Sequence, residues 1–283
     1  MKIFRLSLMA TAAAATLALP TIASARLWLL PSETMFAGNG DEWVTVDFAN
    51  STDLFYFDHP APQMEPVIFA PDGTQVQAEN KGKGRFRATF DIHLTQKGTY
   101  KVAAISNAVF GSYTLNGEEK RLPRGTTAET LAQAIPAGAT DVKTTVMAGR
   151  VETFLTAGEP TNTVFKATGE GLEMVPVTHP NDLIAGEKAT FQFLLNGKPA
   201  ANLPVVAIPG GVRYRGDLKQ VDARTDAEGK VTFTWSDAGM YWISVTTAPP
   251  RPAPAAEGAP RPEPAPRPPR IDSYAATFEV LGS

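Results

Sequence analysis

Short runs of alternating apolar and polar residues are the feature that most constrains how this chain folds. Six clear runs lie at residues 43–48, 85–90, 99–105, 189–195, 230–235 and 241–246. Successive side chains of a strand point to opposite faces, so this patterning predicts half-buried antiparallel strands. Turn-like pairs such as Asn116-Gly117 and Asn196-Gly197 separate the runs. Short strands with frequent turns predict an all-β fold built from β-sandwiches.

A weak internal repeat indicates two such sandwiches. In each half of the chain an alternating run is followed by a turn and then by Gly-x-Tyr, at Gly98-Thr-Tyr100 and at Gly239-Met-Tyr241. This order is typical of a sandwich in which a corner tyrosine anchors a turn with its hydroxyl. We therefore expect an N-terminal sandwich at 26–115 and a C-terminal sandwich at 170–283.

The intervening segment, 116–169, is predicted to connect the sandwiches and to contain one short helix. Thr126-x-x-Glu129 fits a capping box, in which two side chains satisfy free backbone donors at a helix start. Leu131, Ala134 and Ile135 follow at helical spacing, and Pro136 ends the run.

Residues 249–270 have a different composition, since ten of these 22 residues are proline. Such a segment favours an extended polyproline conformation and builds no core. A clear strand pattern at 274–281 follows it, so we interpret it as a disordered insertion in the second sandwich. Two interpretations remain open, a solvated loop of no specific role and a docking arm that reaches a partner.

The first 25 residues read as a secretory signal peptide. Lys2 and Arg5 precede an apolar, alanine-rich stretch at 6–19, and Ala23-Ser-Ala25 has the small-residue pattern of a cleavage site. A buried N-terminal helix is the alternative. Cleavage after Ala25 would deliver the protein to the bacterial periplasm. No second apolar stretch is long enough to span a membrane, so we expect a mature protein that is not membrane-embedded.

Composition excludes several classes of function. Cysteine is absent and histidine occurs three times, which excludes disulfides, thiolate metal sites and a cysteine nucleophile. The formal charge of −3 supplies no basic field for nucleic acid. Sequences typical of serine hydrolases, phosphate-binding loops, zinc proteases and EF-hands are missing. We expect a protein that is not an enzyme and has no nucleic-acid partner.

Two pairs of residues are candidate metal ligands. Asp58 and His59 are adjacent, and a carboxylate beside an imidazole can bind a borderline divalent ion. Asp91 and His93 are two residues apart and share one face of a predicted strand. The alternative in both cases is a plain surface pair.

Three neighbouring side chains could form a ligand pocket beside the first pair. Tyr56 and Phe57 could wall it, and Met64 could add a soft copper ligand. Alternatively, Phe55 and Phe57 face the core while Asp58 and His59 form an exposed strand end.

Seven segments together carry a family resemblance. They are Trp28-Leu-Leu-Pro31, Asp53-Leu-Phe-Tyr-Phe57, Gly149-Arg-Val-Glu-Thr-Phe154, Gly171-Leu-Glu-Met-Val-Pro-Val-Thr-His-Pro-Asn-Asp182, Gly197-Lys-Pro199, Thr225-Asp-Ala-Glu-Gly229 and Ala238-Gly-Met-Tyr-Trp242. They resemble a secreted bacterial family of unknown function with NikM-like members, over nearly the whole mature chain except the proline-rich insertion. The resemblance implies Ig-like or carboxypeptidase-regulatory-like β domains and an accessory role in nickel, cobalt or iron-type uptake.

One departure from that family concerns the mature N-terminus. Its members often carry a histidine there, where imidazole and free amine can hold a metal, whereas this chain has Ala25 and Arg26. The resemblance therefore transfers no ligand onto these positions.

The first functional hypothesis is a non-enzymatic periplasmic accessory protein of transition-metal or metal-complex uptake. It would bind nickel, cobalt, iron or copper and a membrane transporter or another envelope protein. The alternative is an envelope structural or interaction module that binds a protein or glycan partner without metal. For a glycan, exposed aromatics such as Tyr56 or Trp242 would provide the contact.

Overall fold

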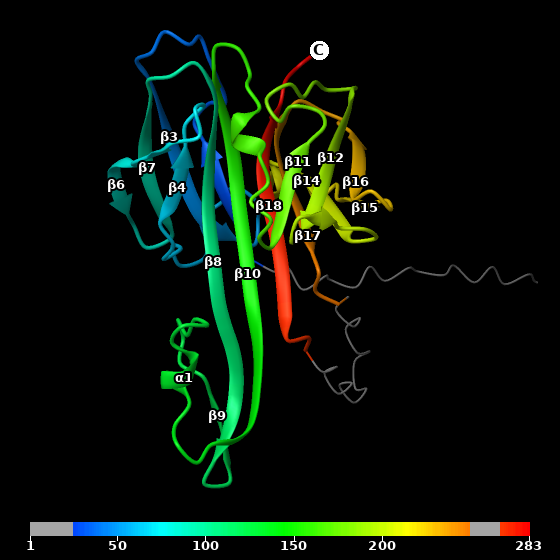
Figure 1. The fold of residues 1–283 in the computed structure, drawn as a ribbon. Coiled ribbons are helices and arrows are strands. Elements are labelled where there is room, and N and C mark those ends of the chain that lie inside the picture. Colours follow the sequence, from blue (N-terminus) through cyan, green and yellow to red (C-terminus); the bar gives the residue numbers. More distant parts are fainter. Residues whose placement is uncertain (1–24, 250–266) are drawn as a thin grey trace, which may run out of the picture.

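The computed structural model describes residues 25–249 and 267–283, whose regular structure is almost entirely β (Figure 1). The strands form three sheets, which we call A, B and C. Sheet A contains, in spatial order, β1 (Arg26–Pro31), β3 (Glu42–Ser51), β7 (Arg87–Leu94) and β6 (Glu79–Lys83). All its neighbouring strands are antiparallel, as the alternating sequence pattern predicts.

Sheet B is the largest and lies at the centre of the molecule. Its order is β15 (Val221–Arg224), β14 (Pro204–Pro209), β17 (Gly239–Thr246), β18 (Arg270–Val280), β10 (Thr140–Ala157), β8 (Gly98–Leu115), β4 (Pro66–Phe69) and β5 (Gln75–Val76). Two short strands, β2 (Met35–Phe36) and β9 (Glu118–Arg121), pair with β10 and β8. The pairing of β10 with β18 is parallel and joins strands from the two halves of the chain.

Sheet C contains β11 (Leu172–Pro176), β12 (Lys188–Leu195), β13 (Lys198–Pro199) and β16 (Lys230–Thr234). The helical elements are short: α1 (Leu131–Ala134), η1 (Thr163–Phe165) and η2 (Val212–Tyr214).

Sheets A and C pack on opposite faces of sheet B. Val102 of β8 and Ala275 of β18 point into the core beneath sheet A. Ala276 and Phe278 of β18 point into a separate core beneath sheet C. Alternate residues of β18 thus pack into different cores, because successive side chains of a strand point to opposite faces. The structure confirms an all-β fold with two β-sandwiches and adds that they share sheet B as a common layer.

The two predicted corner tyrosines hold equivalent turns. The Tyr100 hydroxyl accepts the backbone N–H of Gln96 at 2.8 Å. The Tyr241 hydroxyl accepts the N–H of Asp237 at 3.2 Å and donates to its carbonyl at 3.0 Å. Both tyrosines are buried and reach four residues back along the chain. The repeat seen in the sequence therefore corresponds to a repeated structural device.

Strands β8 and β10 form a long hairpin that extends well beyond both sandwiches (Figure 1). Its outer part has a small core of its own, in which Val109, Tyr113 and Leu122 are buried and Leu131 of α1 packs against them. The segment 116–169, predicted as a connection, thus contains β10, a central strand of sheet B. The place of β10 in sheet B depends on its pairing with β8 and β18, which lie outside the segment 116–169.

The predicted capping box at Thr126 is wrong. The helix α1 begins after Thr130, with no side-chain hydrogen bond at its cap. Thr126 lies in a preceding turn, where its hydroxyl donates to the Pro123 carbonyl at 2.8 Å. This bond orients the Thr126 side chain toward the preceding turn, whereas capping would require its oxygen to accept a backbone N–H at the start of the helix.

Two predictions concern residues outside the described ranges, the signal peptide and most of the proline-rich insertion. Strands β17 and β18, which flank that insertion, are antiparallel neighbours, with Thr246 opposite Ser273. Within residues 25–249 and 267–283, no helix is long and apolar enough to cross a membrane.

Candidate functional site

The predicted ligands Asp58 and His59 lie side by side on a half-exposed loop. The Nδ1 atom of His59 is 2.6 Å from Oδ1 of Asp58. The carboxylate also accepts the backbone N–H of Thr52. Burial alone would raise the pKa of Asp58, but the hydrogen bonds from His59 and Thr52 outweigh it and lower that pKa. The hydrogen bonds of the Asp58 carboxylate therefore stabilise its own loop.

The predicted ligands Asp91 and His93 share the outer face of sheet A, yet each has another partner. Asp91 accepts hydrogen bonds from Thr45 at 2.7 Å and Asn80 at 2.9 Å. His93 Nε2 lies 2.8 Å from Oδ1 of Asp41, and its ring stacks on Trp43 with a centroid distance of 4.2 Å. Across the described residues, no group of three or more His, Cys, Asp or Glu side chains could hold a metal.

The predicted pocket aromatics pack mainly against the protein. Phe57 lies 5.6 Å from the ring of Trp28, Arg87 covers it at 4.8 Å, and Met64 contacts the same core. Tyr56 is 37% exposed, with the guanidinium of Arg213 at 3.9 Å from its ring centroid. The segment is a turn rather than the expected strand end, because Phe55 has a positive φ of 62°.

Trp242 is not the exposed aromatic that the glycan hypothesis requires. It is 8% exposed, and its Nε1 donates to the carbonyl of Leu27 at 3.0 Å. The reason is tertiary: β17 lies in the central sheet, and the N-terminal strand covers this position.

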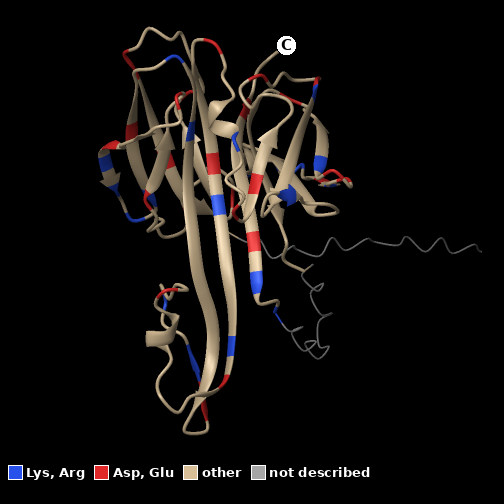
Figure 2. Cartoon of the chain, viewed as in Figure 1, with Lys and Arg blue, Asp and Glu red and all other residues tan. Residues whose placement is uncertain are grey.

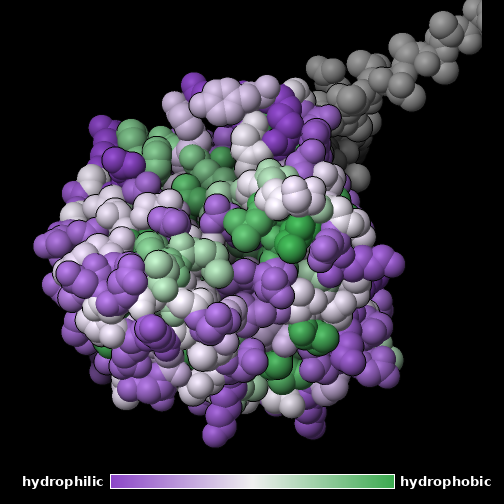
Figure 3. All heavy atoms as spheres, turned by 90° about the horizontal axis from the view of Figure 1, so that it is seen from above, coloured by the Kyte–Doolittle hydropathy of each residue, from purple (hydrophilic) through white to green (hydrophobic). Residues whose placement is uncertain are grey.

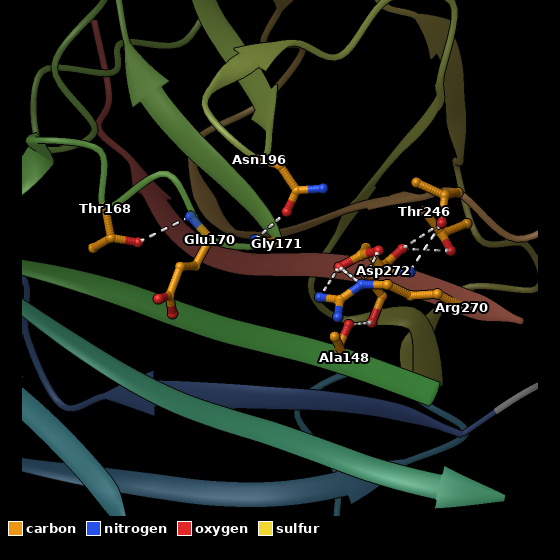
Figure 4. Close-up of polar contacts among 10 residues, drawn as sticks. Ala148, Thr168, Glu170, Gly171, Asn196, Thr246, Arg270 and Asp272 are labelled. Atoms are coloured by element: carbon orange, nitrogen blue, oxygen red, sulfur yellow. Dashed lines mark hydrogen bonds and ion pairs between the residues drawn. The ribbon is translucent and has the colours of Figure 1, made fainter. Parts of the chain in front are cut away.

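An open cleft of about 360 Å3 lies where sheet B continues past the rim of sheet C. Its floor is β8, β10 and β18, and its walls are the segment before α1 and the two turns at 169–171 and 196. Figure 4 shows Asn196, Glu170 and Gly171 above the strands, with Arg270 and Asp272 on β18. The Asn196 side chain accepts the N–H of Gly171 at 3.0 Å and so fixes one turn to the other. We call this site the rim cleft.

A buried ionic network lies behind the rim cleft. Arg150 of β10 has its Nη1 atom 3.4 Å from Glu152 and 3.8 Å from Glu173, and all three side chains are at most 12% exposed. The Tyr274 hydroxyl donates to Glu152 at 2.8 Å. Burial and the adjacent Glu152 carboxylate raise the pKa of Tyr274, so the phenol stays protonated. The network positions the Arg150 guanidinium at the cleft wall.

Glu173 holds the turn that overhangs the cleft. It accepts the backbone N–H groups of Thr168 and Gly169, at 2.9 and 2.8 Å, and the Thr168 hydroxyl at 2.8 Å. Burial alone would raise the pKa of Glu173, but these donors and Arg150 lower it overall. The carboxylate is therefore ionised at neutral pH, and the turn is preorganised.

The second arginine of the cleft is paired as well. Arg270 donates to both oxygens of Asp272, at 2.7–3.0 Å, and these hydrogen bonds to the carboxylate raise the pKa of Arg270. Figure 2 shows acidic and basic residues alternating along the middle of β10 and β18, whereas most of the projecting hairpin is uncharged. The opposite end of the molecule presents apolar side chains in several groups separated by hydrophilic ones (Figure 3). Along these two strands, most of the charge thus lies beside the rim cleft and little of it on the projecting hairpin.

A separate polar network ties the two sandwiches together around His179. Its Nδ1 atom accepts the N–H of Asn181 at 3.1 Å, and its Nε2 atom lies 3.0 Å from the Thr99 hydroxyl. Asn181 continues the network to Thr156 and to the Phe154 carbonyl. Burial lowers the pKa of His179 below 6.5. Because Nδ1 accepts a hydrogen bond, this geometry requires the neutral ring.

Acidification should therefore destabilise the fold through His179. Its pKa is lowered in the folded state, so the unfolded chain takes up the proton first as the pH falls through 6.5. We expect the free energy of unfolding to fall from pH 7 to pH 5 and a His179→Gln variant to show a shallower decline. Urea unfolding at several pH values measures both slopes, and parallel slopes would contradict the assignment.

From the sequence, the histidines were predicted as site residues, and the rim cleft was not predicted. Arg150 and Glu152 are polar residues two apart on an alternating strand, a pattern normally typical of a solvent face. Glu129, Glu170 and Arg270 have no common spacing.

The family described as Domain of unknown function (DUF4198) matches residues 23–248. No curated protein matches this chain.

Similar solved structures include the Yersinia pseudotuberculosis adhesin InvE, at 13% identity and a TM-score of 0.22, covering 90% of this chain and 59% of that one. The D0-D1 domain of intimin matches at 15% identity and a TM-score of 0.22, covering 89% of this chain and 97% of that one. Escherichia coli α2-macroglobulin activated by porcine elastase matches at 10% identity and a TM-score of 0.21, covering 91% and 31%.

Proposed function

Given that this chain belongs to the DUF4198 family, a family of unknown function, we propose that it is a non-enzymatic interaction module of the bacterial envelope. In this proposal a protein partner binds at the rim cleft and along the adjoining hairpin. The expected signal peptide at 1–25 supports an envelope location on the basis of sequence alone.

The observation that carries the proposal is the convergence of three distant segments at one preorganised cleft. Residues 128–129, 169–172 and 270–273 meet there over a floor of paired strands. Asn196 and Glu173 accept hydrogen bonds from backbone N–H groups of the overhanging turn at 169–171 and so fix its position. A site on a rigid sheet with fixed walls loses little conformational entropy on binding, which favours a specific partner.

Site-specific photo-crosslinking in the exporting bacterium tests this function. We expect a crosslinker at Asn107, an exposed residue of the cleft, to give a discrete adduct, and one at Thr234, exposed on sheet C, to give none. Filling the cleft with Ala148→Trp should abolish the adduct. Equal adducts from both positions, or an adduct that Ala148→Trp leaves unchanged, would overturn the proposal. An adduct whose mass shifts after muramidase digestion would instead identify a glycan partner.

The role in transition-metal uptake is a second proposal, and it has one supporting observation. The Nδ1 atom of His59 lies 2.6 Å from Oδ1 of Asp58, and the Nε2 atom of His93 lies 2.8 Å from Oδ1 of Asp41. Each of these two histidines therefore has a carboxylate within hydrogen-bonding distance. Calorimetric titration with nickel, cobalt, copper, zinc and iron(II) tests it. Saturable binding that is lost in His59→Ala and weakens below about pH 6 would support it, whereas affinity unchanged in His59→Ala would exclude that ligand.

A further inference from the structure

The rim cleft contains two arginines, but neither is free to receive an anion. Arg150 lies between the carboxylates of Glu152 and Glu173, and Arg270 is forked onto Asp272. The Arg150 side chain is 12% exposed, so separating it from Glu152 and Glu173 would leave unpaired buried charges. Arg270 is 45% exposed, but its partner Asp272 is 6% exposed and would be left as an unpaired buried charge. The positive charges of both arginines are therefore compensated by carboxylates of the protein itself, which disfavours an acidic ligand.

Two carboxylates at the cleft mouth have no such partner. Glu129 and Glu170 line the cleft, and neither forms an ion pair within the described parts of the chain. The Glu170 side chain points away from Asn196 toward the strands of the floor (Figure 4). The hydroxyl of Thr127 lowers the pKa of Glu129, which keeps it ionised. With the three carboxylates behind the arginines, five acidic groups face two basic ones, so the local field attracts a cation.

The floor beside these carboxylates is apolar. Ile105 is 41% exposed although it lies on a central strand, and Val146, Ala148 and Leu172 line the same cleft. An apolar floor below a carboxylate rim matches the structure of lysine and arginine side chains, whose aliphatic stems pack on apolar surface while the charged head reaches a polar group. A compact inorganic cation would use the rim and leave this floor bare.

We infer that the rim cleft binds a lysine or arginine side chain of an extended partner segment. The stem lies on Ile105 and Val146, and the charged head bonds Glu129 and Glu170. This inference rests on the proposed function and specifies the chemistry of the partner. It also predicts a salt-dependent association, because the two rim carboxylates are exposed to solvent.

A peptide titration tests the inference on the full mature chain. The probe is a fluorescent, capped Gly-Ser peptide with one central arginine, and the comparison is the same peptide with neutral citrulline. We expect saturable binding of the arginine peptide only. The Glu129→Gln/Glu170→Gln variant should weaken it about tenfold, consistent with two solvent-exposed charge pairs. Ile105→Ser should weaken binding of the arginine peptide without changing its salt dependence.

The matched control is Glu159→Gln/Glu187→Gln, which removes the same charge from two exposed positions outside the cleft. Equal loss in both double variants, or equal affinity for the citrulline peptide, would overturn the inference. Tighter binding after deletion of 250–266 would show that this chain's own arginine-bearing segment competes for the cleft, which would overturn the assignment to a partner. If the Asn107 crosslink persists while no arginine peptide binds, the inference fails and the proposed function stands.

Discussion

Replacing Arg150 with Met should lower the free energy of unfolding by about 3 kcal/mol, because it leaves two buried carboxylates without their cation. Glu152 and Glu173 are 3% and 4% exposed and share this one guanidinium. Arg150→Lys should cost less, since it retains the charge. Urea unfolding followed by circular dichroism measures the difference. The control is Lys81→Met, which removes the exposed Lys81–Glu65 pair and should leave the unfolding midpoint almost unchanged.

The loss in Arg150→Met should also depend on pH in a specific direction. Arg150 is one of the groups that lower the pKa of Glu173, so removing it raises the pKa of Glu173 relative to wild type. The folded variant then takes up a proton at a higher pH than folded wild type, so its deficit against wild type shrinks between pH 8 and pH 5. A deficit that stays constant over this range would mean that Arg150 acts by packing and not by charge.

Phe278→Ala is expected to cost about 4 kcal/mol, the range found for removing a buried phenylalanine ring. Phe278 of β18 is 2% exposed and stacks between Phe191 of sheet C, at 5.1 Å, and Phe154 of β10, at 6.1 Å. Its loss opens a cavity in the layer that joins sheet C to sheet B. Because both sandwiches share sheet B, we expect one cooperative unfolding transition displaced to lower denaturant.

Phe110→Ala is the control for this core substitution, since Phe110 is 50% exposed on the projecting hairpin. It should shift the midpoint little. Two separate transitions in Phe278→Ala, one unchanged from wild type, would show that the sandwiches unfold independently in spite of the shared sheet.

Local patterns determined the strands and the class of fold. The alternating runs at 43–48 and 230–235 became β3 and β16 because a strand's two-residue period sorts side chains by face without help from distant residues. The corner tyrosines were predictable for the same reason, since each bonds to a residue only four positions away. The apolar spacing before Pro136 coincides with the four-residue α1, which begins after Thr130 and not at the predicted capping box.

Tertiary structure alone decided the site. The partner of His93 is Asp41, 52 residues away, and not Asp91 on the same strand. Glu129, Glu170 and Arg270 meet because β10 and β18 pair in parallel across more than a hundred residues. Arg150 and Glu152 follow the alternation of a solvent-facing strand, yet sheet C covers them. The pairing of strands depends on how whole faces of the sheets are buried. Burial of a whole face involves residues from the complete chain, so a short stretch of sequence cannot predict it.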